Sequence, residues 1–269
     1  MAKIKVAELF YSIQGEGRYM GVPSIFLRTF GCNFTCGGFN MPQGQCSKEA
    51  DTIAERIDQF KFYHELPLTS TGCDSYASWH PAFKHLSPFM ANDQIVDKMH
   101  SLIPNNQWSK DAVSDDVHLV ITGGEPLLGW QRAYTELLEH PRMADLKNIT
   151  FETNGTQPLH KDFRHTLLNW TLNPRNGLGR RGKDALTFSV SAKLSASGEK
   201  WEDAIKPDTV WDYETYGVTY LKFVVEKMED FDELDRAVDE YRARGFAGPV
   251  FVMPVGGVVR VYDGNRSEE

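Results

Sequence analysis

Short apolar segments recur along the chain and predict the strands of a sheet. They lie at 24–29, 117–121, 149–152, 186–190, 220–225 and 250–253. Helical periodicity fills the gaps between them. Over 230–245 the pattern predicts a helix whose apolar face is formed by Leu234, Ala237, Val238 and Tyr241. Asp230 and Glu233 could form a capping pair at its start, and Gly245 would end it. Alternating strands and helices are typical of an α/β protein with a mostly parallel sheet.

Small and polar residues directly follow four of these segments. The four are Gly31-Cys32, Thr122-Gly123-Gly124-Glu125, Thr153-Asn154-Gly155 and Ser191-Ala192-Lys193. Because the carboxyl ends of parallel strands meet at one edge of a sheet, where α/β folds build their sites, we expect these segments to lie together. Asn154-Gly155 is also a common turn, so both a functional and a turn interpretation apply to Asn154.

Four cysteines are the strongest chemical signal. Cys32 and Cys36 share one short loop, and residues 37–72 separate them from Cys73. Three thiolates leave one iron of a four-iron cluster without an outer ligand, and an open iron can hold a small chelating molecule. Glycines at 123 and 124 would let the backbone approach that molecule closely. The sequence leaves three interpretations of Cys46 open: a cluster ligand in place of Cys73, one ligand of a zinc site made of all four cysteines, or an unligated thiol.

Composition is that of a soluble globular protein, with 41% hydrophobic and 25% charged residues in 269. An apolar run long enough for a transmembrane helix is absent, and residues 1–6 lack the apolar core of a secretion signal. Reduced thiols and a cytoplasmic location are therefore expected. The net charge of −8 argues against a broad surface for nucleic acid.

Two weaker signals favour ordinary structural roles. Gly177–Gly182 formally matches the dinucleotide-binding fingerprint and lies in a basic segment with Arg175, Arg180, Arg181 and Lys183. A true fingerprint follows a strand, whereas turn residues precede this one, so we expect a solvated loop. His118 lies in an apolar strand and is interpreted as a core residue.

Motifs in the same order along the chain resemble the 7-carboxy-7-deazaguanine synthase (QueE) family of radical S-adenosylmethionine enzymes. They are Ser12–Gly17, Gly21–Arg28, Gly31-Cys32, Thr122–Pro126, Glu152–Gly155, Ser191–Lys193, Leu221–Val225 and Met253-Pro254. The resemblance implies an incomplete, open (β/α) barrel over residues 1–257. It also implies a homodimer and an electron donor such as flavodoxin.

The resemblance further implies the cofactor site. Cys32, Cys36 and Cys73 would hold a [4Fe-4S] cluster, with Cys73 favoured because Asp74-Ser75 follows it. The open iron would take the amino and carboxylate groups of S-adenosylmethionine, which would be cleaved to a 5′-deoxyadenosyl radical and re-formed in each turnover. The remaining cofactor contacts would be Gly123, Gly124, Glu125, Asn154, Ser191 and Lys193; of these, Glu125 would accept from the methionine ammonium. Ala192 departs from the proline usual in the family.

The substrate implied is 6-carboxy-5,6,7,8-tetrahydropterin. Gln14 and Glu16 would read the amide and amine edges of the pterin, and Arg28 its carboxylate. Ser75 would help to hold Mg²⁺. Hydrogen abstraction at C6, radical rearrangement, ring contraction and loss of ammonia would follow, giving 7-carboxy-7-deazaguanine for queuosine-type biosynthesis. The alternatives are a strand-end salt bridge for Arg28 and a capping role for Ser75.

Two segments depart from the family pattern. Residues 37–72 are an insertion in the cluster loop, similar to the long insertions of phage-type members. Within this insertion, Thr52 and Glu55 form a capping-box pattern that predicts the start of a helix, and Ile53, Ile57, Phe60 and His64 form an apolar stripe. Residues 258–269 form a divergent, short tail in place of the usual last strand. Two rival functions are a glycyl-radical activase and a non-catalytic zinc-binding module that uses all four cysteines.

Overall fold

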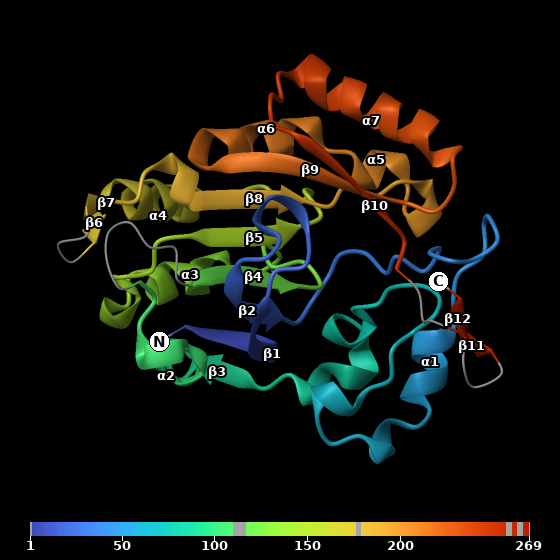
Figure 1. The fold of residues 1–269 in the computed structure, drawn as a ribbon, viewed down its shortest axis with the longest axis horizontal. Coiled ribbons are helices and arrows are strands. Elements are labelled where there is room, and N and C mark those ends of the chain that lie inside the picture. The colour runs from blue at the N-terminus through green and yellow to red at the C-terminus, as the bar shows by residue number, and fades with distance from the viewer. Residues whose placement is uncertain (1, 110–116, 176–178, 257–259, 263–265, 269) are drawn as a thin grey trace.

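A single large sheet organises the computed structural model, which describes residues 2–109, 117–175, 179–256, 260–262 and 266–268. Within these residues eight strands pair in the order β10-β9-β8-β5-β4-β2-β1-β3. Their bounds are β1 Lys3–Ile13, β2 Pro23–Thr29, β3 Phe89–Ala91, β4 His118–Gly123, β5 Ile149–Thr153, β8 Leu186–Val190, β9 Val218–Val225 and β10 Val250–Pro254. All six strands predicted from the apolar segments are confirmed (Figure 1).

The sheet is an open (β/α) barrel. Strands β2, β4, β5, β8, β9 and β10 are parallel, whereas β1 pairs antiparallel with both β2 and β3. Strands β10 and β3 are the two edges of this sheet as far as it is described. The register places Arg28 opposite Thr122 and Glu152 opposite Ser189, so the carboxyl ends of neighbouring strands lie level with one another.

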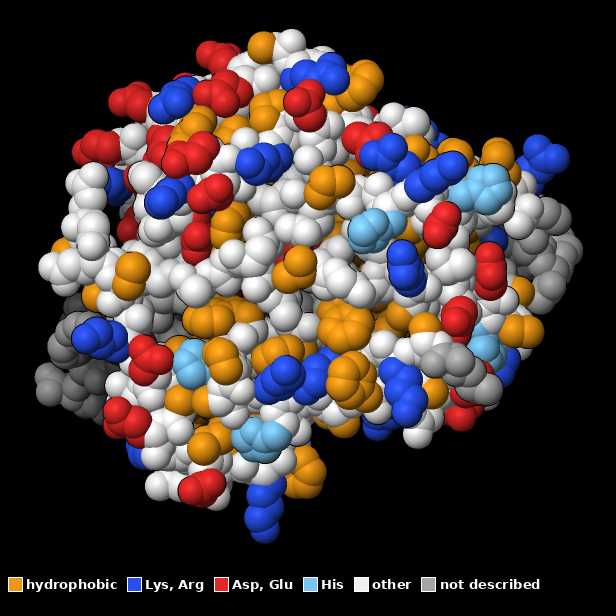
Figure 2. Space-filling model, turned by 180° about the vertical axis from the view of Figure 1, so that it is seen from behind, with side chains coloured by type: hydrophobic (Ala, Val, Ile, Leu, Met, Phe, Trp, Pro, Cys, Tyr) orange, Lys and Arg blue, Asp and Glu red, His pale blue; other side chains and the backbone are white. Residues whose placement is uncertain are grey.

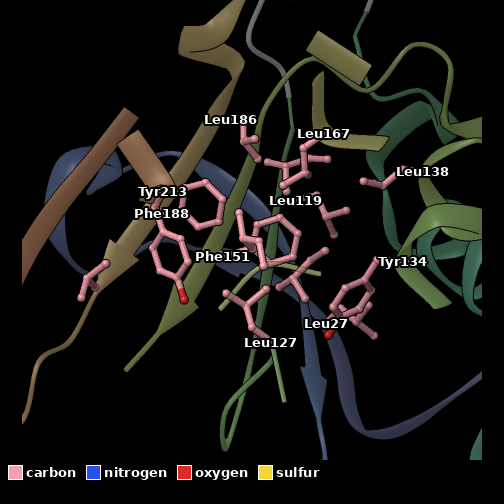
Figure 3. Packing of buried hydrophobic residues seen from close by; sticks show 14 of the residues in the cluster. Leu27, Leu119, Leu127, Tyr134, Leu138, Phe151, Leu167, Leu186, Phe188 and Tyr213 are labelled. Atoms are coloured by element: carbon pink, nitrogen blue, oxygen red, sulfur yellow. The ribbon is translucent and has the colours of Figure 1, made fainter. Parts of the chain in front are cut away.

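Residues alternate between the two faces of each strand, as the two-residue period requires. On one face the strands contribute apolar side chains to the core, for example Leu27, Leu119 and Phe151. Aromatic rings continue this packing onto the helices: the rings of Phe151 and Phe188 are 5.8 Å apart, and those of Phe188 and Tyr213 are 4.5 Å apart (Figure 3). The opposite face carries polar side chains, among them Arg28, Glu152 and Lys222, which line the cavity of the candidate site.

Helices cover the apolar face, and neighbouring helices contact one another in the order α2, α3, α4, α6, α7. The bounds are α1 Glu49–Ala54, α2 Asn92–Leu102, α3 Gln131–Leu138, α4 Lys161–Leu172, α5 Trp201–Ala204, α6 Pro207–Tyr216 and α7 Asp230–Arg244. Short 3-10 helices span Gly17–Tyr19, Ile57–Gln59, Tyr63–Glu65, Tyr76–Ser78, Pro81–Leu86, Pro104–Asn106, Pro141–Met143, Lys183–Ala185 and Ser195–Ser197.

Helix α7 confirms the predicted periodicity but not the predicted cap. Gly245 ends the helix with a φ of 107°, a left-handed conformation that favours glycine. Asp230 and Glu233 form no capping pair. Asp230 instead accepts the backbone N–H groups of Glu226 and Lys227, and Glu233 accepts that of Ser195.

The insertion at 37–72 is folded and its two ends are tied together. The Ser47 N–H donates to Gly37 O at 2.7 Å, and the Gly72 N–H donates to Phe39 O at 2.8 Å. The apolar stripe packs as predicted, with Ile53 buried and Ile57 beside it, in a small cluster with Tyr76 and Phe83. The helix is shorter than predicted: α1 begins at Glu49, so Thr52 lies inside it and forms no capping box. His64 stacks on Phe62 and is not part of this cluster.

The remaining strands are two short hairpins. Strands β6 Pro174–Arg175 and β7 Gly179–Arg180 form a hairpin where a solvated loop was predicted, and residues 176–178 of the fingerprint lie outside the described residues. Arg181 donates from Nε to Leu146 O at 2.8 Å and from Nη2 to Ala144 O at 2.7 Å, so it anchors this segment. In the predicted tail, β11 Arg260–Tyr262 pairs with β12 Arg266–Glu268, while 258, 259, 263–265 and 269 lie outside the described residues.

His118 is a core residue, as predicted. It is 3% exposed, its Nε2 lies 3.0 Å from Thr150 Oγ1, and its ring packs edge-on against Tyr19. On the molecular face shown in Figure 2, acidic and basic side chains are interspersed over the surface. No helix among the described residues is long and apolar enough to cross a membrane.

Candidate active site

One cavity of about 650 Å³ lies at the carboxyl ends of the parallel strands. This size falls in the range of small-molecule sites. All but one of the residues predicted for a site line it: Gln14, Glu16, Arg28, Cys32, Cys36, Cys73, Ser75, Gly123, Gly124, Asn154, Ser191 and Lys193. The structure thus brings together segments that lie far apart in the sequence.

The three cysteines form one end of this cavity. Cys36 is 6% exposed and Cys32 and Cys73 are partly buried. The Phe34 N–H donates to Cys32 Sγ at 3.4 Å, a contact that suits a thiolate. Burial raises the pKa of Cys32 to about 12, and burial also raises the pKa of Cys73. The free thiols are therefore neutral, and a metal that binds them must displace their protons.

Three thiols that line one cavity are the protein ligands needed by a four-iron cluster that keeps one iron open. Among the described residues, no three His, Cys, Asp or Glu side chains are close enough together to hold one metal ion. A four-iron cluster instead binds each thiolate through a different iron. Cys46 is exposed and does not line the cavity, so the structure does not support a zinc site made of all four cysteines.

Gly123, the last residue of β4, and Gly124 allow the cluster loop to pack closely against the end of this strand. A Cβ on Gly124 would lie 2.8 Å from Cys32 Cβ and 2.5 Å from Gly31 O, so no larger residue fits there. The Glu125 N–H donates to the same Gly31 oxygen at 2.7 Å. The turn therefore fixes the approach of the chain to Cys32.

Glu125 is placed differently from the prediction. Its side chain is fully buried, and it is absent from the residues that line the cavity. The carboxylate accepts from the N–H groups of Leu127 and Asn154 and from the Thr153 hydroxyl, at 2.9, 2.7 and 2.8 Å. With these three donors it joins the ends of β4 and β5, and its contact with a substrate ammonium stays a prediction.

Asn154 lines the cavity and also forms the turn that its sequence suggests. Its Oδ1 accepts from the Thr156 N–H at 3.1 Å, and its Nδ2 donates to Asn33 Oδ1 at 2.9 Å. Asn33 is the neighbour of Cys32, so Asn154 also steadies the cluster loop. In the loop after the next strand, β8, Lys193 Nζ donates to Ser191 Oγ at 3.0 Å, and its ammonium lies 6.0 Å from the centre of the Phe39 ring.

A second polar group forms the cavity wall near β9. Gln14 Nε2 donates to Glu152 Oε1 at 2.9 Å, and Gln14 Oε1 accepts from the Glu16 N–H at 3.2 Å. Lys222 Nζ donates to Glu16 Oε2 at 2.5 Å. Lys222 is 8% exposed, and although burial opposes its charge, Glu152 and Glu16 raise its pKa. Two carboxylates thus share one buried ammonium beside the cavity.

Glu152 and Lys222 were not predicted as site residues, although they belong to two of the motifs that carry the family resemblance, Glu152–Gly155 and Leu221–Val225. A signal was present for each. Lys222 is the charged residue in the apolar strand β9, and Glu152 stands two positions before Asn154, hence on the same face of the chain.

Arg28, predicted to bind the substrate, contacts Ser75, predicted to bind magnesium. Its Nε donates to Glu8 Oε2 at 3.2 Å, and its Nη1 donates to Ser75 Oγ at 3.1 Å. Ser75 in turn donates to Asp74 Oδ1 at 3.1 Å. Burial raises the pKa of Glu8, while Arg28 acts in the opposite direction. Glu8, a further residue that sequence reasoning missed, orients the guanidinium; the salt bridge proposed as an alternative role for Arg28 is therefore present.

The insertion supplies part of the cavity wall. Phe39, Leu68, Thr69 and Gly72 line the cavity next to the cysteines. Phe39 also packs against the cysteine cluster.

Comparisons with known proteins agree with the motifs. No family model matches the chain. A 7-carboxy-7-deazaguanine synthase from Halobacterium salinarum is 29% identical over 286 residues, covering 98% of this chain and 82% of that protein. Proteins of the same name from Rhodopirellula baltica and Pyrobaculum aerophilum are 26% and 28% identical and cover 98% and 94% of this chain, and 78% and 80% of their own lengths.

Among solved structures, QueE from Escherichia coli matches 94% of this chain and 84% of its own, with 18% identity and a TM-score of 0.49. The similarity to the synthases extends over nearly the whole chain. The chain is therefore similar over nearly its whole length to 7-carboxy-7-deazaguanine synthases, and the resemblance carried by its motifs is confirmed.

Proposed function

We propose that the chain is a 7-carboxy-7-deazaguanine synthase. It is a radical S-adenosylmethionine lyase that converts 6-carboxy-5,6,7,8-tetrahydropterin to 7-carboxy-7-deazaguanine with loss of ammonia, in 7-deazapurine biosynthesis. One observation carries the proposal: a single cavity holds the three cysteines at one end and the Gln14, Glu16 and Arg28 side chains on its wall. The named relatives are synthases, so nothing favours a glycyl-radical activase.

The cysteine end fits a [4Fe-4S] cluster. Cys32, Cys36 and Cys73 would be the ligands, and the wall beside them would hold S-adenosylmethionine through Gly123, Gly124, Asn154, Ser191 and Lys193. When bound, cluster and cofactor together supply a 5′-deoxyadenosyl radical for hydrogen abstraction. The Lys193 ammonium lines the same cavity, and its positive charge favours the thiolate form of Cys36 by acting to lower the pKa of that thiol against the effect of burial.

The second polar group suits the pterin. Glu16 and Glu152 offer carboxylate oxygens to amino and ring N–H groups, and Gln14 presents an amide that can both donate and accept. Arg28 offers the two parallel donors that match the pterin carboxylate. Lys222 balances the two carboxylates, so both can face the ligand as acceptors.

Ser75 is proposed to bind Mg²⁺ together with substrate oxygens and water. Its hydroxyl and the neighbouring Asp74 carboxylate are oxygen ligands of the hard type that Mg²⁺ prefers. Because Arg28 donates to Ser75 Oγ, a cation at this point requires an anionic substrate group beside it. Mg²⁺ and the pterin carboxylate are therefore expected to bind together.

The working unit is proposed to be a homodimer, reduced by a flavodoxin-type donor and located in the cytoplasm. These proposals rest on the family resemblance. Light scattering of the purified protein tests the dimer, and replacement of dithionite by reduced flavodoxin in the activity assay tests the donor.

Anaerobic reconstitution tests the function. The protein receives iron and sulfide, is reduced, and meets S-adenosylmethionine, Mg²⁺ and the carboxytetrahydropterin, with products followed by mass spectrometry. We expect 7-carboxy-7-deazaguanine. A matched control with tetrahydropterin, which lacks the carboxylate, should give no deazaguanine. Cofactor cleavage without conversion of the pterin would refute the proposed substrate, and colourless protein that holds only zinc would refute the radical chemistry.

A further inference from the structure

The loop after β8 packs against the cluster loop and is hydrogen-bonded to it. The Gly38 N–H donates to Ser197 O at 2.9 Å. Glu199 Oε1 accepts from the Cys36 N–H at 2.7 Å and from the Thr35 N–H at 2.9 Å. One carboxylate oxygen thus receives two consecutive backbone donors, one of which belongs to a predicted cluster ligand.

The backbone of Cys36 needs such support. Its φ is 47°, in the left-handed region that residues other than glycine rarely adopt. Its side chain is almost fully buried, so an N–H without an acceptor there would be costly. Hydrogen bonds from N–H groups to a carboxylate are charge-assisted and are among the stronger ones in proteins.

The neighbouring contact shows that the two loops are packed at backbone distance. A Cβ on Gly38 would lie 2.5 Å from Gly198 N and 2.7 Å from Ala196 O. Any change in one loop must therefore move the other. The same loop after β8 begins with Ser191 and Lys193, which line the cavity.

We propose that Glu199 is a positioning residue for the cluster ligand Cys36. Its carboxylate fixes the left-handed turn that directs the Cys36 thiol into the cavity, and it couples the loop after β8 to the cluster loop. The inference rests on the cluster of the proposed function and adds a residue to which the motifs assign no role.

Two substitutions separate the hydrogen bonds of Glu199 from its charge. Glu199→Gln keeps an oxygen acceptor and removes the charge, whereas Glu199→Ala removes both. Glu202→Ala, an exposed carboxylate nearby in α5, is the matched control. The reconstituted proteins are mixed anaerobically with an iron chelator, and cluster loss is followed by absorbance. Midpoint potentials come from redox titration followed by electron paramagnetic resonance.

We expect Glu199→Ala to lose iron about tenfold faster than wild type, because two backbone donors lose their acceptor. Glu199→Gln should lose iron at close to the wild-type rate, with a midpoint potential shifted to more positive values because a negative charge near the cluster is gone. Glu202→Ala should match wild type in both measurements. If the alanine variant does not fold, Glu199→Asp, one methylene shorter, takes its place.

Three results would overturn the inference. They are wild-type rates of iron loss in Glu199→Ala, equally fast loss in Glu199→Gln, and equally fast loss in Glu202→Ala. Wild-type protein that takes up no four-iron cluster would overturn the proposed function and this inference with it. A stable wild-type cluster with an unaffected alanine variant would overturn this inference alone.

Discussion

Replacing Lys222 by methionine tests the substrate end of the cavity most directly. Lys222 is nearly buried between Glu16 and Glu152, with its ammonium 2.5 Å from Glu16 Oε2. Methionine is unbranched and apolar, so it can occupy the space without the charge. The substitution leaves two carboxylates facing each other with no cation between them.

The magnitude follows from the burial of the three groups. Removing one partner of a fully buried ion pair costs about 3–5 kcal/mol. The Glu16 side chain is 43% exposed, however, so water screens part of this interaction. We therefore expect Lys222→Met to lower the free energy of unfolding by about 2 kcal/mol. If about 1.4 kcal/mol of this loss reaches the substrate contacts, the KM for the pterin rises about tenfold.

Three measurements check this reasoning. Denaturant unfolding gives the stability, steady-state kinetics give the KM, and cleavage of S-adenosylmethionine without pterin reports on the cysteine end, which should be unaffected. Lys222→Arg retains the charge and should keep most of the stability. Adding Glu152→Gln to Lys222→Met removes the repulsion and should restore part of the stability. Unchanged stability and KM in Lys222→Met would refute the role given to this ammonium.

Further predictions concern the other parts of the site. Arg28→Lys keeps the charge but not the paired donors, so kcat/KM for the pterin should fall about tenfold or more in steady-state kinetics; an unchanged value would contradict carboxylate binding by Arg28. Glu125→Gln places an amide N–H against a backbone donor and should cost about 3 kcal/mol in denaturant unfolding. Because burial raises the pKa of Glu125 from 4.5 to about 7, the native state retains a proton that the unfolded chain has already lost. Wild-type stability should therefore fall as pH rises from about 4.5 to 7, and this component should vanish in the variant. Cys46→Ser should keep the wild-type iron content and Cys73→Ser should lose it; the reverse outcome in iron and sulfide analysis would contradict the ligand set.

The sequence predicts most of the sheet because buried parallel strands leave a simple pattern. In β4 the result is an apolar run, Leu119 to Ile121, whereas β8 alternates apolar and polar residues with the two-residue period of a strand. Strand β1 was missed because charged residues interrupt it, as at Lys5 and Glu8, and its pairing with β2 and β3 is not a local property. Strand β3 has only three residues, too few for any periodicity.

The site could be predicted as far as its residues follow strands. Because parallel strands end at one edge, the motifs at 122–124, 153–155 and 191–193 were expected together, and they lie in one cavity. The direction of a side chain is a different matter. Three donors from β5 and from the turn after β4 hold Glu125 away from the cavity, and the motif alone does not reveal them. The contacts of Lys222 with Glu16 likewise join positions 206 residues apart.

The tied ends of the insertion have a consequence for how the segment between them can vary. The hydrogen bonds from Ser47 to Gly37 and from Gly72 to Phe39 close the segment at its base, directly beside Cys36 and Cys73. The entropic cost of bringing the two ends together grows only slowly with the length of the segment between them. Leu68 and Thr69 line the cavity, so the part of the insertion that can vary freely is the stretch from 48 to 67. Lengthening, shortening or replacing it should leave the spacing of the thiols intact, so the loop can acquire new surfaces while the chemistry stays the same.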